Sequence, residues 1–530
     1  MNFTFTSEGN SFVQNYELKE KESLNIQTLT GNDVLYLLMP DRFSNGDYSN
    51  DKFADMMDTE MDRSNPWLRH GGDLKGISNH LDYLSELGIT ALWLNPVIEN
   101  DQPQTNEGGD LRSAYHGYGF TDHYNVDRRL GGNLAYKDMV KKAHAIGIKV
   151  IQDAVYNHVG INHYFLKDIP MKSWLNQWET YTNTNYNGHT VPAPNASFYD
   201  KLRTTDGWFM PFLPDLNQRN PLVANYLIQH AIWTVQEFGI DAYRIDTYMY
   251  NDMDFMNACN VALKAQFPGI FLFGESLASP MPNQAAFVRN NLKLPFRANI
   301  ESTVDYQLHK AMLEGLKENY GWNEGVNRLY QLLTLDYLYQ DPFKLVTYLD
   351  NHDENRFLSE IGEDMRKFKM GLTWLMTLRG IPEIYYGTEL AVKNFKDPTD
   401  AEVRKDFPGG WKEDKINKFD MAGRIKVEQE TFDFTKKLIQ IRKESKAIGK
   451  GSFTQFLPFD DGVYAYFRIY DNESIMVISN ASEKEHIVDV SRFEEVLKGN
   501  RKAMELLTAK ETDLNELRLA AFEVKVLKVM

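Results

Sequence analysis

Three segments of the chain repeat one pattern: an amphipathic stretch, a Gly-Ile pair and a short apolar run that ends in a polar residue. They span residues 81–95, 139–153 and 233–246. In the first, Leu81, Leu84 and Leu87 fall on one helical face, and Gly88 stands where a left-handed helix cap is expected. Each segment is interpreted as a helix, a turn and a buried strand. Repeated units of this kind predict parallel strands joined by helices, an α/β architecture.

Other apolar runs add to these three predicted strands. They lie at residues 34–39, 270–275, 344–350 and 383–389, with a weaker candidate at 301–305, which makes eight. Eight parallel strands within roughly 400 residues favour a closed (β/α)8 TIM barrel over an open sheet. An open nucleotide-binding sheet would carry a glycine-rich phosphate loop after its first strand, and the sequence has none there.

The spacing of the repeats predicts further domains. The second interval between Gly-Ile pairs is longer than the first by roughly 33 residues, which indicates an insertion after the third strand. The inserted residues, at about 159–217, are rich in Asn, Thr and aromatic side chains and predict a loop-rich subdomain. We expect the barrel itself at 33–446. Residues 447–530 predict a C-terminal all-β sandwich, and residues 1–32 an N-terminal arm or the remnant of an N-terminal domain.

Charge and composition limit the partners. The net charge is −16, from 58 basic and 74 acidic residues, and no basic stripe is present, so nucleic acid is not an expected partner. No apolar run reaches the roughly 18 residues that span a bilayer, so we expect no membrane segment. The start of the chain lacks a signal sequence. The protein is then either cytoplasmic, or periplasmic or secreted with its signal removed. A monomer and a homodimer both remain open.

The ends of the predicted strands carry carboxylates and histidines, and the C-terminal strand ends are where barrels place their chemistry. These residues are Asp153, His158, Arg244, Asp246, Glu275, His352 and Asp353. Such a ring of side chains suits either a metal-dependent enzyme or a glycosidase with two catalytic carboxyl groups. Arg244 is on the same strand face as Asp246 and can keep it ionised. Glu275 follows an apolar run, and burial there would raise its pKa, as a proton donor requires.

The same segments resemble a known family in order and spacing. DAVYNH (153–158), GIDAYRIDTY (239–248), LFGES (272–276) and YLDNHD (348–353) resemble the four signature regions of the α-amylase family, glycoside hydrolase family 13. LPDLN (213–217) resembles its fifth region, and GIPEIYYGTE (380–389) its eighth strand. The resemblance covers the chain from about Asp33 onwards.

The resemblance implies a role for each matching residue. Asp246 would be the nucleophile, Glu275 the general acid and base, and Asp353 the carboxylate that binds sugar hydroxyls and stabilises the transition state. Five further residues would bind substrate: Arg244, His158, His352, Tyr118 and Asp153. Tyr118, in YHGYGFTD, resembles the tyrosine on which the reacting sugar ring stacks.

A second group of oxygen-bearing residues follows the first strand. Asn45, Asp47, Asn50 and Asp51 lie in SNGDYSND, and hard oxygen ligands at this spacing suit calcium. DRFSNGD together with HGGDLKG resembles the calcium site of the cyclomaltodextrinase and neopullulanase branch. That resemblance implies that Gly71 and Asp73 complete the shell, and that the Ca²⁺ is structural.

The sequence also departs from endo-acting α-amylases, because Thr247 and Tyr248 follow Asp246 and the usual Lys-His pair is missing. RKDFPGGW (404–411) resembles a segment of neopullulanases and cyclomaltodextrinases. The resemblance therefore implies a retaining hydrolase of α-1,4-glucosidic bonds in α-glucan oligosaccharides, whether cyclodextrins, maltooligosaccharides or pullulan. Two alternatives stay open: a glucosyl transferase or isomerase of the same family, and a non-catalytic sugar-binding accessory protein.

Overall fold

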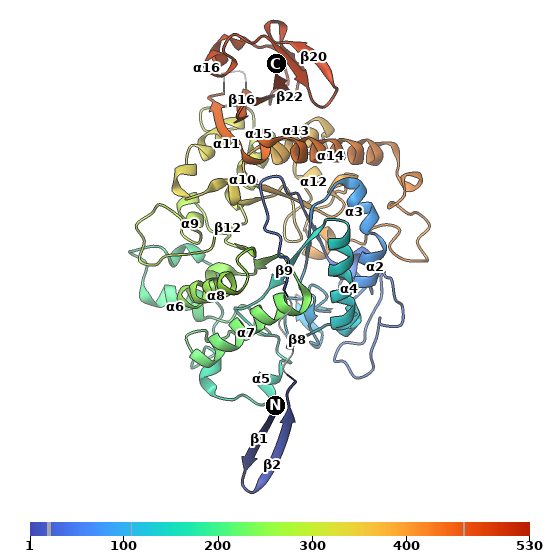
Figure 1. Cartoon of the computed structure of the whole chain (residues 1–530), viewed down its shortest axis with the longest axis vertical. Helices are drawn as coiled ribbons and strands as arrows, with labels where there is room; N and C mark the ends of the chain where they lie inside the picture. Colours follow the sequence, from blue (N-terminus) through green and yellow to red (C-terminus); the bar gives the residue numbers. More distant parts are fainter. Residues whose placement is uncertain (18–22, 108, 459–461) are drawn as a thin grey trace.

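A parallel eight-stranded barrel forms the centre of the molecule (Figure 1). The computed structural model describes residues 1–17, 23–107, 109–458 and 462–530. In spatial order the strands are β12 (Ser302–Thr303), β11 (Phe271–Gly274), β10 (Ala242–Ile245), β9 (Lys149–Ala154), β4 (Ala91–Leu94), β3 (Leu35–Leu38), β14 (Ile381–Tyr385) and β13 (Val346–Thr347). A parallel bridge between Val304 and Val346 joins the two end strands. The predicted eight-stranded barrel is confirmed.

The barrel strands are short and buried on both faces, as their apolar sequences predict. Every residue of β3, β4, β10 and β11 is buried. The surrounding helices include α3 (Leu81–Leu87), α4 (Gly132–Ala145), α7 (Pro221–Phe238), α8 (Met253–Gln266), α10 (Tyr306–Lys317), α11 (Val326–Leu333), α13 (Met365–Thr377) and α14 (Lys426–Glu444). Helix α3 ends at Gly88, whose φ of 99° is the left-handed cap that the sequence indicated.

Long loops after two strands build the rim above the barrel. The loop after β4 carries β5 (Ile98–Glu99), β6 (Thr105–Glu107), β7 (Asp110–Arg112) and β8 (Asp122–Val126), which the sequence pattern did not predict. The insertion after β9 contains the four-residue α5 (Tyr164–Lys167) and the nine-residue α6 (Phe198–Asp206), two helices that the prediction of a loop-rich subdomain did not include. Ser197 begins α6 by accepting a hydrogen bond from the Asp200 amide, a local capping signal.

The C-terminal region is an antiparallel six-stranded sheet. Its strands, in spatial order, are β15 (Ser452–Phe456), β16 (Val463–Tyr470), β17 (Glu473–Asn480), β22 (Val524–Val529), β19 (Lys502–Glu505) and β20 (Lys510–Asp513). One face of the sheet contacts the barrel helices, where Trp374 Nε1 donates to Ser479 Oγ over 3.2 Å. The opposite face has its own apolar core. Its second layer includes β18 (His486–Ile487), β21 (Arg518–Leu519) and α16 (Glu494–Leu497), so it is far smaller than the first.

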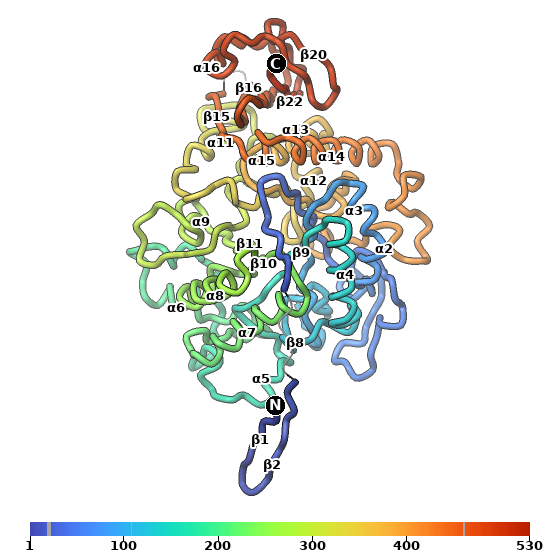
Figure 2. The backbone as a smooth tube through the Cα atoms, in the orientation of Figure 1, coloured from blue at the N-terminus to red at the C-terminus, as the bar shows by residue number. Residues whose placement is uncertain are grey.

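The first strands stand apart from the rest. β1 (Asn2–Ser7) and β2 (Asn10–Asn15) pair as an antiparallel hairpin in which every residue is exposed. Figure 2 shows this hairpin projecting beyond the barrel, at the end opposite the C-terminal sheet. Among the described residues, no helix combines the length and the apolar character needed to cross a membrane.

Candidate active site

Arg244 is the centre of the site, and the register of the barrel places its partners around it. Strand β10 pairs with β9 so that Arg244 lies opposite Asp153. Its Nη1 atom lies 2.9 Å from Asp153 Oδ1 and 2.7 Å from Asp246 Oδ1. Its Nη2 atom lies 2.9 Å from Glu275 Oε1. One fully buried guanidinium group therefore holds the carboxylates at the C-terminal ends of three neighbouring strands.

Asp153, Asp246 and Glu275 share the single positive charge of Arg244. Burial and this shared charge together determine the pKa values of the three carboxyl groups. Burial raises the pKa of Glu275 to about 6; Arg244 opposes the rise and the Asp246 charge adds to it. Burial also raises the pKa of Asp246, against the pull of Arg244. Arg244 was expected to hold Asp246 ionised; it favours the ionised form, but burial and the Asp153 charge outweigh it, and Arg244 is shared with Asp153 and Glu275. A glutamic acid with a raised pKa can donate a proton near neutral pH.

A second polar group lies across the cavity around Asp353. His352 Nε2 lies 3.1 Å from Asp353 Oδ2 and 2.8 Å from the Tyr118 hydroxyl. Tyr118 in turn donates to Asp153 Oδ2 over 3.1 Å, and its ring stacks on His352 at a centroid distance of 5.7 Å. The hydrogen bonds join Asp353 to the Arg244 group and fix the orientation of the Tyr118 ring.

Arg404 supports Asp353 from the loop after β14. Its Nη2 atom lies 2.8 Å from Asp353 Oδ1, and its Nε donates to the His352 carbonyl over 2.8 Å. Burial favours the protonated form of Asp353, but His352 and then Arg404 outweigh it and hold the pKa of Asp353 well below its usual range. Asp353 is therefore a permanent negative charge facing the cavity.

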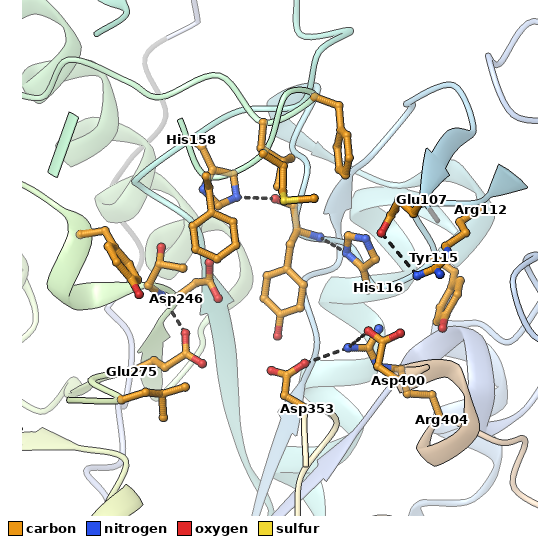
Figure 3. Close-up of a pocket in the computed structure, with 18 of the residues that line it drawn as sticks. Glu107, Arg112, Tyr115, His116, His158, Asp246, Glu275, Asp353, Asp400 and Arg404 are labelled. Carbon is orange, nitrogen blue, oxygen red and sulfur yellow. Dashed lines mark hydrogen bonds and ion pairs between the residues drawn. The ribbon is translucent and has the colours of Figure 1, made fainter. Parts of the chain in front are cut away.

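These groups surround a cavity of about 430 Å³. Asp246, Glu275, Asp353, Tyr118 and His158 line it, while Arg244, Asp153 and His352 are buried behind the lining residues. Figure 3 shows Asp246, Glu275 and His158 on one side, and Arg404, Asp400, Arg112 and Glu107 on the other. His158 contacts the backbone of Tyr118: its Nε2 donates a hydrogen bond to the Tyr118 carbonyl over 3.1 Å.

Some lining residues were not singled out from the sequence. They include Arg404, Asp400, His116, Arg112 and Glu107. The segment that begins at Arg404 was recognised only as a mark of the branch. The available sequence signal was the i, i+4 pair of Asp400 and Arg404. In the structure Asp400 Oδ2 lies 2.8 Å from Arg404 Nη2. His116, two residues before Tyr118, stacks on the Tyr118 ring at a centroid distance of 5.6 Å.

The residues expected to hold calcium form a separate group, and none lines the cavity. Asn45 Nδ2 donates to Asp51 Oδ1 over 2.7 Å, and Asn50 Nδ2 lies 3.4 Å from Asp73 Oδ2. A Cβ atom added at Gly71 would lie 2.9 Å from Asp51 Oδ1, so the Gly71 backbone also reaches the group. Asp47 is tied to the same group, because its amide donates to Asp73 Oδ2 over 2.8 Å, while its Oδ1 accepts hydrogen bonds from the amide and hydroxyl of Ser49.

Two observations show that this group suits a hard cation. Asn50 Oδ1 is buried without a hydrogen-bond partner among the described residues. Burial raises the pKa of Asp51, and the neighbouring Asp73 and Asp41 charges add to the rise. The described residues contain no cluster of three His, Cys, Asp or Glu side chains arranged for a metal. A cation here would also need amide and backbone oxygens, which calcium accepts as ligands.

Comparisons with known proteins agree with this geometry. Residues 37–421 match the α-amylase catalytic domain, and residues 453–528 match the cyclo-malto-dextrinase C-terminal domain. A cyclomaltodextrinase of Geobacillus thermopakistaniensis (strain MAS1) is 30% identical, covering 85% of this chain and 69% of that protein.

Two solved structures extend the likeness to the whole fold. The α-amylase from Geobacillus thermoleovorans in complex with acarbose is 28% identical, with a TM-score of 0.75 over 95% of this chain and 99% of that one. CldA, a cyclomaltodextrin glucanotransferase, is 25% identical, with a TM-score of 0.77 over 95% of this chain and 99% of that one.

A parallel barrel whose strand ends bring an aspartate, a glutamate and a second aspartate to one cavity is the arrangement that a glycoside hydrolase requires. The chain belongs to the α-amylase family, glycoside hydrolase family 13. Within this family it is a hydrolase of the cyclomaltodextrinase and neopullulanase type.

Proposed function

We propose that the protein hydrolyses α-1,4-glucosidic bonds of cyclodextrins, maltooligosaccharides or pullulan with retention of configuration. The proposal rests chiefly on Arg244, whose guanidinium group contacts both Asp246 and Glu275. Retaining glycosidases need their two carboxyl groups close together, because one attacks the sugar directly and no water has to fit between them.

The proposed reaction has two displacement steps. Glu275 gives its proton to the glycosidic oxygen while an Asp246 oxygen bonds to the anomeric carbon and the bond to the leaving group breaks. Glu275, now ionised, then takes a proton from water, whose oxygen displaces Asp246 from the anomeric carbon. Asp353 accepts hydrogen bonds from sugar hydroxyl groups, and its negative charge favours the positive charge that develops on the ring.

The family and the lining of the cavity support the proposed substrate class. Tyr118 presents an aromatic ring beside the catalytic carboxylates, and such a ring stacks against the apolar face of a pyranose. The polar side chains across the cavity, including Asp400 and Arg404, suit sugar hydroxyl groups as hydrogen-bond partners.

Proton NMR of the anomeric signals tests the proposal directly. β-Cyclodextrin and maltoheptaose are each digested, and the first product anomer is recorded before mutarotation. We expect α-anomers first. Ring opening of the cyclodextrin would assign a cyclomaltodextrinase activity, whereas cleavage of maltoheptaose alone would restrict the substrate to linear chains. β-Anomers, or no reaction with either glucan, would overturn the proposal.

A second candidate is transfer of the glycosyl group to another sugar. The likeness to a cyclomaltodextrin glucanotransferase over nearly the whole chain favours it. So does the apolar lining beside Glu275, because a site that excludes water slows hydrolysis of the covalent intermediate. Product analysis at high maltotriose concentration decides: products longer than the substrate indicate transfer, and their absence indicates hydrolysis.

We also propose that Ca²⁺ binds the group formed by Asn45, Asp47, Asn50, Asp51, Gly71 and Asp73 and stabilises the loop after β3. When bound, the ion supplies positive charge to this acidic group. Asp73 also caps helix α2 (Leu74–Asn79) by accepting from the Gly76 amide, so the same carboxylate would connect the ion to the barrel. This site takes no part in the proposed reaction.

A further inference from the structure

The two ends of the cavity differ in chemistry. Charged side chains lie across from Glu275, as Figure 3 shows for Arg112, Asp400 and Arg404. Apolar and aromatic side chains form much of the remaining wall, and they include Phe209, Phe212, Met249, Tyr250 and Leu277. One sugar ring can therefore be bound by hydrogen bonds at one end, whereas a ring at the other end meets mostly hydrophobic surface.

Tyr250 and Phe209 connect this aromatic wall to the catalytic carboxylates. Their ring centroids are 5.8 Å apart, and Phe209 also stacks on His158 at 5.5 Å. Burial raises the pKa of the Tyr250 hydroxyl, and the nearby Glu275 charge adds to the rise. Because Glu275 protonates the departing oxygen in the proposed reaction, the leaving group must lie on this side of the scissile bond.

Tyr186 extends the aromatic wall outwards. Its ring packs edge-on against Phe209, with centroids 5.5 Å apart and planes at 85°. Its hydroxyl donates to the Phe209 carbonyl and accepts from Asn183 Nδ2 over 3.2 Å. The side chain is nevertheless 47% exposed. The hydroxyl is thus fixed while much of the ring stays open to a ligand.

The backbone at Tyr186 is also unusual. Its φ is 55°, in the left-handed region that aromatic residues rarely adopt. Holding a non-glycine residue there strains the backbone, and such strain concentrates at binding sites. Tyr186 does not itself line the cavity, but it contacts Phe209 and Met210, which do. The strained backbone therefore keeps an exposed aromatic ring against the wall of the cavity.

We propose that Tyr186, together with Phe209, forms the platform that binds the pyranose ring of the leaving group. This inference rests on the proposed glycosidase function and adds a specificity-determining residue to it. The ligand is the glucose unit on the Glu275 side of the scissile bond, whose apolar face packs on the tyrosine ring.

The test compares two substrates that differ only on the leaving-group side. Maltoheptaose places a sugar ring there, whereas α-maltosyl fluoride has a fluoride ion as its leaving group and places none. Tyr186→Asn removes the ring, and asparagine tolerates the left-handed backbone. We expect this variant to lower kcat/KM for maltoheptaose by about fivefold or more, and to leave kcat/KM for α-maltosyl fluoride within about twofold of wild type.

Two control variants distinguish loss of the platform from a general loss of folding or activity. Tyr199 is a 56% exposed tyrosine of the same insertion that packs edge-on against Trp178, which does not line the cavity, whereas Tyr186 packs on Phe209, which does. Tyr199→Ala should leave both substrates unaffected. Tyr186→Phe keeps the ring and should stay within about twofold of wild type on maltoheptaose.

Equal losses on the two substrates with Tyr186→Asn, or no loss on maltoheptaose, would overturn the platform. So would a loss with Tyr186→Phe as large as that with Tyr186→Asn. A wild-type protein that turns over neither substrate would instead overturn the proposed function itself. The two failures are therefore distinguishable.

Discussion

The backbone amide of Thr247 donates a hydrogen bond to Glu275 Oε2 over 2.9 Å. Thr247 directly follows Asp246 and has a φ of 46°, which is a strained conformation for a β-branched residue. This turn aims the amide at Glu275 and so joins the proposed nucleophile to the proposed acid through a single peptide unit. The same hydrogen bond opposes the rise in the pKa of Glu275.

Asp246→Asn should remove the nucleophile while keeping the shape of the side chain. We expect kcat on maltoheptaose to fall by roughly a thousandfold or more, because the amide cannot form the covalent intermediate. Asp252→Asn is the control, since Asp252 lies outside the cavity lining and asparagine can replace it as the cap of α8. A variant at position 246 that keeps about a tenth of the wild-type rate would contradict the assignment.

The pH dependence should report the protonation of Glu275. The acid must be protonated to act, and its pKa is about 6, so kcat/KM should fall as the pH rises through this value. Glu275→Gln should lose maltoheptaose cleavage but still form the glycosyl-enzyme from α-maltosyl fluoride, whose leaving group needs no proton. Stopped-flow release of fluoride measures that step. If the alkaline fall persists in this variant, another group causes it.

Arg404 should act through Asp353. Replacing Arg404 by Met removes a charge 2.8 Å from the Asp353 carboxylate, so the pKa of Asp353 should rise. Asp353 would then be protonated at a higher pH, which an NMR titration of its carboxyl carbon measures directly; the acid limb of kcat/KM does not isolate this change, because the proposed nucleophile Asp246, whose pKa is raised, sets that limb. We also expect kcat at neutral pH to fall by about tenfold or more, as for other lost transition-state contacts. Arg404→Lys should restore part of the shift in the Asp353 pKa, whereas an unchanged Asp353 pKa in Arg404→Met would argue against this role.

Removal of calcium should lower stability and leave the chemistry intact. Free Ca²⁺ at a concentration about 100 times its Kd adds about 2.7 kcal/mol to the free energy of unfolding, so chelation should lower the Tm by roughly 2–3 °C. Differential scanning calorimetry with and without added Ca²⁺ measures the shift. Asp51→Asn should reduce it, while Asp55→Asn, at an exposed ion pair with Arg128, should not. No calcium-dependent change in Tm in the wild type would contradict the site.

The barrel could be predicted from local patterns, because most of its strands lie in short apolar runs that end in a polar residue, with β12 (Ser302–Thr303) as an exception. β10 and β11 illustrate this: all their residues are buried, and Asp246 and Glu275 follow directly. Helix α6 was missed because its signal is a single Ser197 cap within a stretch of Asn and Thr. The strands after β4 were missed because β6 and β7 are three residues each, too short to show a period.

The sequence by itself determined the strands, the family signatures and the order of the catalytic carboxylates, since these depend on residues that are neighbours along the chain. Only the tertiary structure decided which distant side chains meet at the cavity. Arg404 reaches Asp353 across 51 positions of sequence, and Tyr186 reaches Phe209 only because the insertion folds back on itself. Such contacts depend on how loops close over the barrel, and no local period or propensity encodes that geometry.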